Sequence, residues 1–454
     1  MAKDLLVDGG NYTSYHTEVA GGALVRIVKF WVNKEIVLRI AVLSYHTCPL
    51  ATLGGKDAGG MNVYVRDLSL YLGREGVQLD VFTRSQDEHV PHVLHDLGYG
   101  NRVAHIPAGP EYPLPKKQLA SHVPEFVDRI LEFSSAKSLN YDLIHSHYWM
   151  SGLAAEKLSA AWQAPVIQMF HTLGKLKQAV AQNSQEAEGK YRIDGEFQVV
   201  QNADVIVAST STEKEQLETL YQAPPDKIEV IPPGVDLSHF YPIPPDEAKE
   251  YVGIPQEKRM LLFVGRLEPL KGIKTLLRAI GILRQKGQAD DDLCLAVIGG
   301  ELADKDGQET DEVRSLLKLR DEFGLEDMVT FLGKRSQDSL PYYYSAAEMV
   351  IMPSHYESFG MVALESMACG TPVIASLVGG LIHLVEDGVT GYHVPVDNPQ
   401  ALSLRIHSLL EDKSLRYRMG HDAFAFAKKY SWENISSRML DLYGALLTGS
   451  SLPD

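Results

Sequence analysis

Short apolar runs rich in Val and Ile alternate with longer segments that carry apolar residues at helical spacing. The first half of the chain contains five of these runs, and a helical pattern follows each of them. They read VLRIAVLSY, VQLDVFTR, YDLIHSH, APVIQMFHT and ADVIVAST. Repeated strand–helix units of this kind predict a parallel, doubly wound α/β sheet.

A second set of strand–helix units follows an interruption. The stretch KIEVIPPGVDLSHFYPIPPDE contains five prolines and no periodicity, which is typical of a linker between domains. Beyond it the strand candidates read RMLLFVGRLEPLKG, LCLAVIGG, MVTFLGKR, EMVIMPS and TPVIASLVGG. The sequence therefore predicts two doubly wound, Rossmann-like domains that face each other across a cleft.

A chain of 454 residues is long enough for two separate cores. We expect an N-terminal leader (1–36), a first domain (37–235), a second domain (236–430) and a C-terminal helix (431–454) that packs back towards the first domain. The leader has no continuous run of eighteen apolar residues, so we expect no membrane role for it.

Composition narrows the class of function. The chain has 43 Lys and Arg against 59 Asp and Glu, a formal net charge of −16. This balance argues against a nucleic-acid-binding surface but leaves room for a local basic pocket. Cys48, Cys294 and Cys369 are widely separated and lack the spacing of a zinc or redox motif. A cytoplasmic location is the simplest expectation.

Glycines gather where the first strand candidate meets a helix expected near Met61. Gly54, Gly55, Gly59 and Gly60 lie in this loop. Bare backbone beside the free N–H groups of a helix N-terminus suits a phosphate or diphosphate. The spacing matches neither a Walker loop nor G-x-G-x-x-G, so a plain structural turn is the alternative.

Two cations follow the first strand of the second half. Arg266 and Lys271 lie in the turn after Gly265, where ligands of open α/β sheets bind. They could neutralise a leaving diphosphate. The alternative is a pair of solvated surface charges.

Two carboxylates flank a later helix start. Glu357 follows the strand candidate EMVIMPS, and Glu365 lies two turns away from it, on the helix that begins near Gly360. They could bind the hydroxyls of a donor hexose and of a ribose. The alternative is that Glu357 complements the helix dipole and Glu365 is an ordinary helix-surface acid.

Six motifs carry a resemblance to a known family: GGKDAGGMNVYVRDLS, DLIHSHYWMSG, FHTLGKLK, PPGVDLSHF, VGRLEPLKG and ESFGMVALESMACGTPVIAS with its following VGG. Residues 37 to about 440 resemble the retaining glycosyltransferases of the GT-B fold. Within these, they resemble the family-four group of sucrose synthases, sucrose-phosphate synthases and D-inositol 3-phosphate glycosyltransferases. The resemblance implies a UDP-sugar donor, no metal or other cofactor, no nucleic acid and no stable membrane insertion, and leaves homo-oligomerisation open.

The resemblance implies a donor site in the second domain. Arg266 and Lys271 would hold the diphosphate, and loss of either should lower the rate on the order of 10²-fold. Glu365 would bind the ribose, and Glu357 with nearby backbone N–H groups would bind the donor sugar and its phosphate. The implied donor-binding residues are Gly59, Gly60, Arg266, Lys271, Lys334, Arg335, Glu357, Ser358, Phe359, Gly360, Met361, Val362 and Glu365.

Family enzymes of this kind retain the anomeric configuration without a placed protein nucleophile. The usual proposal is front-face attack, in which the leaving phosphate takes the acceptor proton. The implied catalytic residues are His171, Arg266, Lys271 and Glu357. His171 would lie beside the anomeric centre or the primary hydroxyl, although a His after an apolar strand is more often a buried core residue. The Asp290–Asp292 triplet resembles a metal–nucleotide motif but precedes its strand, at the wrong end of the sheet.

The resemblance also implies an acceptor site in the first domain for a small phosphorylated sugar or polyol. The implied acceptor-binding residues are Asn62, Lys116, Lys117, Tyr148, Thr172 and Arg192. Ordinary solvated loop residues are the alternative for the two lysines. A basic pocket in so acidic a chain would steer a phosphorylated molecule towards it.

The choice of acceptor rests on the glycine loop and the insert after FHT. DAGGMNVYV is closer to the inositol-phosphate branch, while the sucrose-phosphate branch more often has a Thr-Gly-Gly-Gln version. We nevertheless favour transfer of glucose from UDP-glucose to fructose 6-phosphate, as in sucrose biosynthesis. The second choice is a D-inositol 3-phosphate glycosyltransferase that uses UDP-N-acetylglucosamine. A UDP-sugar epimerase or a non-catalytic nucleotide-sugar binding protein of the same fold is more remote.

Overall fold

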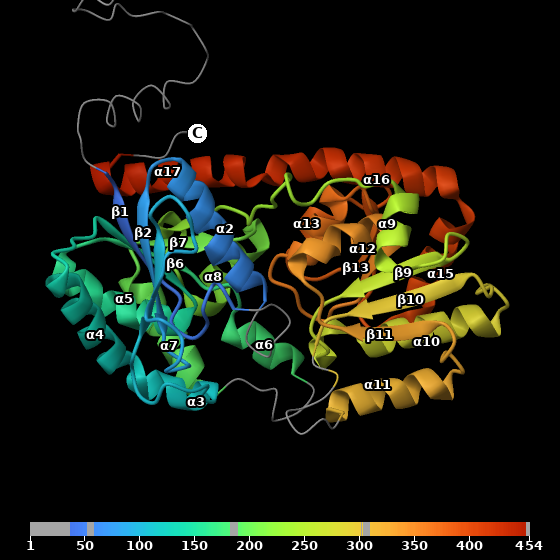
Figure 1. Ribbon diagram of the computed structural model, residues 1–454, viewed down its shortest axis with the longest axis horizontal. Helices are drawn as coiled ribbons and strands as arrows, with labels where there is room; N and C mark the ends of the chain where they lie inside the picture. The colour runs from blue at the N-terminus through green and yellow to red at the C-terminus, as the bar shows by residue number, and fades with distance from the viewer. Residues whose placement is uncertain (1–36, 52–58, 182–188, 301, 303–308, 451–454) are drawn as a thin grey trace, which may run out of the picture.

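The computed structural model describes residues 37–51, 59–181, 189–300, 302 and 309–450. Two α/β domains stand side by side, and two helices near the end of the chain run along one edge of both (Figure 1). Each domain is built on one mostly parallel sheet with helices packed against it. The predicted fold class is confirmed.

The first domain contains an eight-stranded sheet in the order β3-β4-β2-β1-β5-β6-β7-β8, parallel except for the β3–β4 pair. Its strands are β1 (Arg39–Leu43), β2 (Gln78–Arg84), β3 (Val93–Leu94), β4 (Arg102–Ile106), β5 (Leu143–His147), β6 (Val166–Met169), β7 (Val205–Ala208) and β8 (Ile228–Val230). The five predicted runs form β1, β2, β5, β6 and β7. The pattern misses β3, β4 and β8. Strands β3 and β8 are short, with two and three residues, and β8 lies inside the Pro-rich stretch that resembles a linker.

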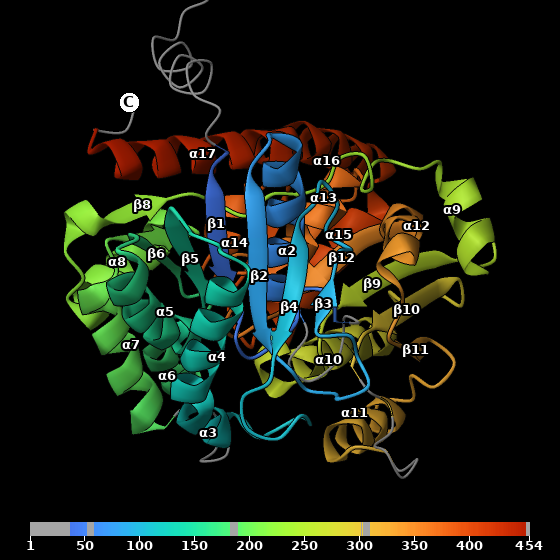
Figure 2. The ribbon, with the colours of Figure 1, turned by 60° about the vertical axis from the view of Figure 1, so that its left-hand side comes forward.

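The helices of the first domain cover both faces of this sheet. They are α2 (Gly60–Arg74), α3 (Lys116–Leu119), α4 (Val123–Ala136), α5 (Trp149–Trp162), α6 (Gly174–Val180), α7 (Lys190–Asn202) and α8 (Ser211–Tyr221). Buried side chains of α4, α5, α7 and α8 share one core with one face of the sheet, and those of α2 share a second core with the other face. Figure 2 shows β4, β2 and β1 side by side in this domain.

The second domain repeats the design with six parallel strands in the order β11-β10-β9-β12-β13-β14. The strands are β9 (Arg259–Val264), β10 (Leu293–Ile298), β11 (Val329–Gly333), β12 (Ala347–Met352), β13 (Val373–Ser376) and β14 (Gly391–Val394). The helices are α9 (Pro245–Val252), α10 (Ile273–Gln285), α11 (Asp311–Glu322), α12 (Leu340–Ala346), α13 (Met361–Ala368), α14 (Leu381–Leu384), α15 (Pro399–Glu411) and α16 (Lys413–Ala427). The predicted runs form β9 to β13, and the pattern misses only the edge strand β14.

The last helix, α17 (Trp432–Thr448), belongs to the core of the first domain although it follows the second in sequence. Its residues Trp432, Met439 and Tyr443 are buried in the same cluster as side chains of β1 and α2. The apolar residues of α17 recur at helical spacing and so form one stripe, which faces the domain, while the other faces of the helix are polar. The chain thus crosses between the domains twice.

The two crossings lie against each other. Val235 on the first crossing donates its N–H to the carbonyl of Tyr430 on the second (2.8 Å), and Trp432 donates its N–H to the carbonyl of Val235 (3.2 Å). This backbone pairing links the two crossing segments to each other over only a few residues.

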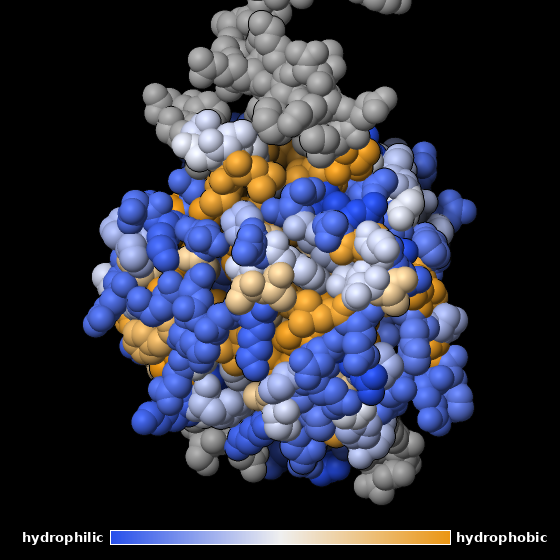
Figure 3. Space-filling model, turned by 90° about the vertical axis from the view of Figure 1, so that its left-hand side faces the viewer, coloured by the Kyte–Doolittle hydropathy of each residue, from blue (hydrophilic) through white to orange (hydrophobic). Residues whose placement is uncertain are grey.

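Figure 3 shows the outer face of the first domain, where hydrophilic side chains cover most of the surface and apolar ones lie between them. No helix among the described residues is both long enough and apolar enough to cross a membrane.

Candidate active site

A cavity of about 320 Å³ lies between the two domains, where loops at the carboxyl ends of both sheets meet. This is the usual position for a ligand in open α/β sheets. The predicted site residues that line it are Gly59, Gly60, Asn62, Lys116, Tyr148, His171, Thr172, Arg266, Lys271, Lys334, Arg335, Glu357, Ser358, Phe359, Gly360, Met361, Val362 and Glu365. Lys117 and Arg192 are not among the lining residues.

Two helix N-termini meet across the cavity. Helix α2 begins at Gly60 in the first domain, and α13 begins at Met361 in the second. A Cβ placed on Gly60 would lie 3.5 Å from the Met361 Cγ, so the two ends are in close approach. The free N–H groups and positive dipole end of each helix favour an anion between them.

The start of α2 is held by Asn62. Its side-chain Oδ1 accepts the N–H of Gly59 at 2.9 Å, and its Nδ2 donates to Thr47 Oγ1 at 2.8 Å and to the carbonyl of Cys48 at 2.6 Å. Asn62 is 1% exposed. The amide therefore holds Gly59 at the start of α2, and the predicted contact of Asn62 with an acceptor stays a prediction. Gly54 and Gly55 of the predicted glycine loop lie outside the described residues.

In the second domain, two loops that carry the predicted diphosphate and sugar ligands are locked together. Lys271 Nζ lies 2.5 Å from Glu357 Oε2, and the N–H of His355 donates to the carbonyl of Leu270 at 2.8 Å. Gly272 has φ +70°, and a Cβ on it would lie 1.9 Å from the carbonyl oxygen of Pro353. Only glycine permits this close approach without strain.

The loop that carries Glu357 rests on the VGG motif. A Cβ on Gly379, which has φ +45°, would lie 1.7 Å from the carbonyl oxygen of Glu357. The N–H of Gly380 donates to that same oxygen at 3.2 Å. The pair of glycines lets the backbone of the Glu357 loop pack directly on the segment before α14, which sets the position of the Glu357 carboxylate.

Glu365 is buried inside α13 rather than on its surface. It is 6% exposed, and Tyr344 Oη donates to Glu365 Oε2 at 2.6 Å. Burial raises the pKa of this carboxyl to about 7, the Tyr344 hydrogen bond opposes the rise, and Asp67 of the first domain adds to it. The interpretation of Glu365 as an ordinary surface acid is therefore wrong.

His171, which is half-buried, lies at the end of a row that continues with the buried His147 and His145. Its Nε2 lies 3.0 Å from His147 Nδ1, and the His145 Nδ1 lies 2.8 Å from Tyr443 Oη on α17. Burial lowers the pKa of His171 to about 3, with a smaller contribution from His145, and lowers that of His147 well below its usual value. His171 is therefore a neutral imidazole at the cavity wall, with Nε2 already engaged.

Arg192 lies behind the cavity wall. Its Nη2 donates to the carbonyl (2.9 Å) and Oγ1 (3.0 Å) of Thr172, its Nε pairs with Glu196 at 2.8 Å, and its guanidinium lies 5.0 Å from the Tyr148 ring centre. The residue is 1% exposed. It thus supports Thr172 and Tyr148, which do line the cavity, and its role as an acceptor ligand stays a prediction, as does that of Lys117.

Sequence reasoning missed several residues at the cavity, notably Lys177 on α6 and Tyr356, whose hydroxyl accepts the N–H of Leu173 across the domains at 3.4 Å. Lys177 belongs to the motif FHTLGKLK, which follows a predicted strand, and this position could have indicated that it lies at the cavity. The cationic residues that line the cavity are Lys116, Lys177, Arg266, Lys271, Lys334 and Arg335. The carboxylates that line it are Glu268, Glu357 and Glu365, so cations outnumber anions six to three.

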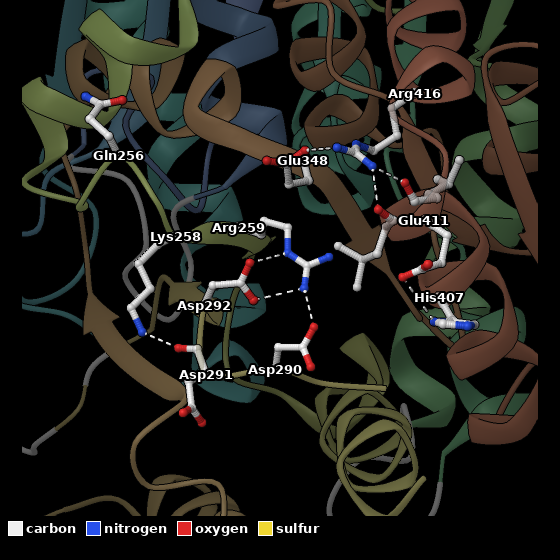
Figure 4. A network of polar contacts seen from close by, with 12 residues as sticks. Gln256, Lys258, Arg259, Asp290, Asp291, Asp292, Glu348, His407, Glu411 and Arg416 are labelled. Carbon is white, nitrogen blue, oxygen red and sulfur yellow. Dashed lines mark hydrogen bonds and ion pairs between the residues drawn. The ribbon is translucent and has the colours of Figure 1, made fainter. Parts of the chain in front are cut away.

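The aspartate triplet lies at the opposite end of the second sheet, as predicted. Arg259, the first residue of β9, pairs with Asp292 at 2.7 Å and with Asp290 at 3.3 Å, and Lys258 donates to the carbonyl of Asp291 at 2.5 Å (Figure 4). These aspartates are engaged in a structural network away from the cavity. Among the described residues, no three or more His, Cys, Asp or Glu side chains form a group that could hold a metal ion.

Two doubly wound domains with a basic cavity between the carboxyl ends of their sheets define the class of GT-B glycosyltransferases. Comparison with known proteins gives the family. Residues 58–239 match the family described as Glycosyltransferase Family 4, and residues 245–426 match the one described as Glycosyl transferases group 1. The chain belongs to glycosyltransferase family 4.

Its sequence relatives include two D-inositol 3-phosphate glycosyltransferases. The one from Saccharomonospora viridis is 39% identical over 407 residues, which cover 89% of this chain and 93% of the relative. The one from Salinispora arenicola is 39% identical over 414 residues, which cover 89% and 91%.

Among solved structures, sucrose-phosphate synthase from Thermosynechococcus elongatus superposes with a TM-score of 0.83 at 33% identity, and the match covers 91% of this chain and 100% of that chain. Anabaena HepE in complex with UDP and glucose superposes with a TM-score of 0.70 at 22% identity over 90% and 100%. At 22% identity, the similarity to HepE supports only a shared fold.

Proposed function

We propose that the protein is a retaining, metal-independent hexosyltransferase that moves a sugar from a UDP-sugar to a hydroxyl of a small phosphorylated acceptor. The observation that carries the proposal is the charge of the cavity. A chain of net charge −16 places six cationic side chains from both domains around one space. Such a concentration of positive charge suits two phosphorylated substrates that must meet there.

The second domain supplies the donor side. Arg266, Lys271 and the N-terminus of α13 would hold the diphosphate, and they would stabilise the charge that develops when the sugar–phosphate bond breaks. Glu365 would accept a hydrogen bond from the ribose, and Lys334 and Arg335, which line the cavity, would contact the base. Glu357 would bind the sugar hydroxyls.

The first domain supplies the acceptor side. Lys116, Tyr148 and Thr172 come from three different segments of the first domain, and all three line the cavity. An ammonium group, a phenol and a hydroxyl are suitable donors for a phosphate. The acceptor would then present a free hydroxyl to the anomeric carbon beside His171.

D-inositol 3-phosphate is the first candidate for the acceptor, with UDP-N-acetylglucosamine as donor. The relatives that bear this name are 39% identical to the chain, against 33% for the sucrose-phosphate synthase. This order reverses the expectation from the sequence alone, which favours fructose 6-phosphate and sucrose biosynthesis. Fructose 6-phosphate with UDP-glucose stays the second candidate because of the TM-score of 0.83 to the synthase.

Retention of the anomeric configuration fits the distribution of carboxylates. All three that line the cavity, Glu268, Glu357 and Glu365, come from the second domain, and Glu357 is paired with Lys271. Among the described residues, the acceptor side of the wall offers no carboxylate base. The leaving phosphate would therefore take the acceptor proton as the new bond forms on the same face.

The test is UDP release from UDP-N-acetylglucosamine and UDP-glucose, each with D-inositol 3-phosphate or fructose 6-phosphate, with and without EDTA. Turnover in EDTA and an α-linked product from the α-linked donor would support the proposal. Turnover without any phosphorylated acceptor, an inverted product, or silence with all four pairs would refute it.

A further inference from the structure

The segment that carries Lys116 has an unusual path. Residues 107–119, here called the β4–α3 arm, join β4 to the short helix α3 and contain Pro107, Pro110, Pro113 and Pro115. Before α3 the arm has neither helix nor strand, so its carbonyl groups need partners from elsewhere in the protein. Two buried side chains, those of Arg84 and Tyr45, bind carbonyl groups of the arm, one before Lys116 and one after it.

Arg84 holds the part of the arm before α3. It is the last residue of β2 and is 1% exposed. Its Nη1 donates to the carbonyls of Pro110 at 2.6 Å and Ala108 at 3.3 Å, and its Nη2 donates to that of Tyr112 at 2.7 Å. One planar guanidinium therefore binds every second carbonyl over five residues, which fixes the direction of the chain there.

Tyr45 holds the other end. Its hydroxyl donates to the carbonyl of Leu119, the last residue of α3, at 2.7 Å, and its side chain is fully buried. Its own carbonyl accepts the N–H of Arg84 at 3.0 Å, so the two anchors are joined to each other. Arg84 ends β2 and Tyr45 follows β1, two interior strands of the first sheet that pair in register. The arm is thus attached to the middle of the sheet, where Figure 2 shows β1 and β2 side by side.

These anchors bear on which lysine faces the cavity. Lys116 lines it and Lys117 does not. Successive residues of an α-helix point about 100° apart. Helix α3 has only four residues, and among these Leu119 alone is buried in the core of the domain. The contacts from Arg84 and Tyr45 therefore add to the burial of Leu119 in holding the segment.

We infer that Arg84 and Tyr45 are positioning residues for acceptor binding: they fix the β4–α3 arm so that Lys116 faces the cavity. The inference rests on the proposed function, since it takes the acceptor to be phosphorylated and to be bound by Lys116. Neither residue lines the cavity, so both act through the arm.

The test compares Arg84→Lys and Tyr45→Phe with two matched controls in the same domain. Arg102→Lys alters an arginine that pairs with Asp80, and Tyr141→Phe removes a buried hydroxyl that donates to Asp80 at 2.6 Å.

The measurements are KM for D-inositol 3-phosphate or fructose 6-phosphate, KM for the UDP-sugar, kcat and the melting temperature. We expect Arg84→Lys to raise the acceptor KM about tenfold, since a small displacement of a binding group is costly, and Tyr45→Phe to raise it less. The donor KM should stay unchanged in both, and the controls should move neither KM even where they lower the melting temperature.

A second measurement separates positioning from general loss of stability. In a Lys116→Ala background, Arg84→Lys should raise the acceptor KM no further, because the two substitutions act on one interaction. Additive effects, equal rises in both KM values, or an unchanged acceptor KM in Arg84→Lys would overturn the inference.

A third measurement does not depend on turnover. Amide hydrogen exchange in residues 107–119 should be faster in Arg84→Lys than in the wild type, and unchanged in Arg102→Lys. If the wild type transfers sugar to no phosphorylated acceptor, that result alone refutes the proposed function. If exchange in the arm is the same in Arg84→Lys and the wild type, the positioning role fails whatever the substrate.

Discussion

Lys271 Nζ and Glu357 Oε2 lie 2.5 Å apart although the two residues are 86 positions apart in the sequence. The pair joins the two loops proposed to hold the diphosphate and the sugar. Each charge neutralises the other at the cavity wall, where both side chains are only partly exposed. A bound diphosphate would compete with Glu357 for Lys271, so donor binding would also free the carboxylate to meet the sugar hydroxyls.

Replacement of Lys271 by Ala should lower kcat about 100-fold or more, because a cation at the leaving diphosphate acts mainly in the transition state. The fold should survive, since the side chain is at the cavity rim. Lys274→Ala is the matched control, because Lys274 lies on α10 beside Glu312 and not at the cavity. UDP release measures turnover, and circular dichroism shows whether the fold is retained. Near-normal turnover in Lys271→Ala would remove it from the diphosphate site.

Arg192→Ala should both destabilise the protein and raise the acceptor KM more than the donor KM. It would leave Glu196 buried without its charged partner, and breaking a buried ion pair typically costs about 3–5 kcal/mol. It would also remove the donors that hold Thr172.

The double variant Arg192→Ala, Glu196→Ala separates these two effects. It should recover part of the stability, measured by urea unfolding, because the unpaired carboxylate is gone. It should not recover the acceptor KM, because Thr172 is still unsupported. A restored KM would mean that Arg192 acts on stability alone.

His171 should stay neutral throughout the range in which the enzyme is assayed. Its pKa of about 3 lies well below the ordinary histidine value because of burial. Its imidazole signals in a ¹³C-edited NMR spectrum should therefore not shift between about pH 5 and pH 8, a range that spans the ordinary value. A midpoint for His171 within that range would contradict the neutral state.

Glu365 should make the protein less stable as the pH rises. Its pKa in the folded state is about 7, above the ordinary 4.5, so the folded state retains a proton that the unfolded state releases between these values. Stability from this group is full below about pH 4.5 and is lost as the pH rises through about 7. Glu365→Gln is neutral at every pH, so its melting temperature should fall less than that of the wild type between pH 5 and pH 8. Parallel curves for the two proteins would refute the shift.

Trp432→Ala should destabilise the first domain by about 3–5 kcal/mol, the usual cost of removing a large buried aromatic ring. Trp432 is fully buried and lies 5.5 Å from the Tyr64 ring centre. Leu447→Ala, on the same helix but 38% exposed, should cost far less. Fluorescence and chemical unfolding would measure the difference, and equal losses would mean that α17 is only loosely attached.

The sequence predicts the strands well where they are long and apolar, and it places most cavity residues because parallel strands bring their carboxyl ends to one edge. It could not decide between Lys116 and Lys117, since the rotation of a four-residue helix depends on tertiary contacts, among them the burial of Leu119 and, as we infer, the hydrogen bonds from Arg84 and Tyr45. Glu365 looks like a surface acid because its partner Tyr344 lies on another helix. The Arg192–Glu196 pair, in contrast, has the i, i+4 spacing of a helical ion pair and could have been predicted.

The place of α17 in the core of the first domain has a consequence for biosynthesis. Side chains of α2 and β1 bury their apolar surface against a helix that the ribosome makes after the whole second domain. The domain that is translated first therefore has an exposed apolar face until α17 has been made, and cannot finish folding as an independent unit. During that interval the nascent chain is open to aggregation or to chaperone binding at this face, and the docking of α17 is the closing step in the folding of this domain.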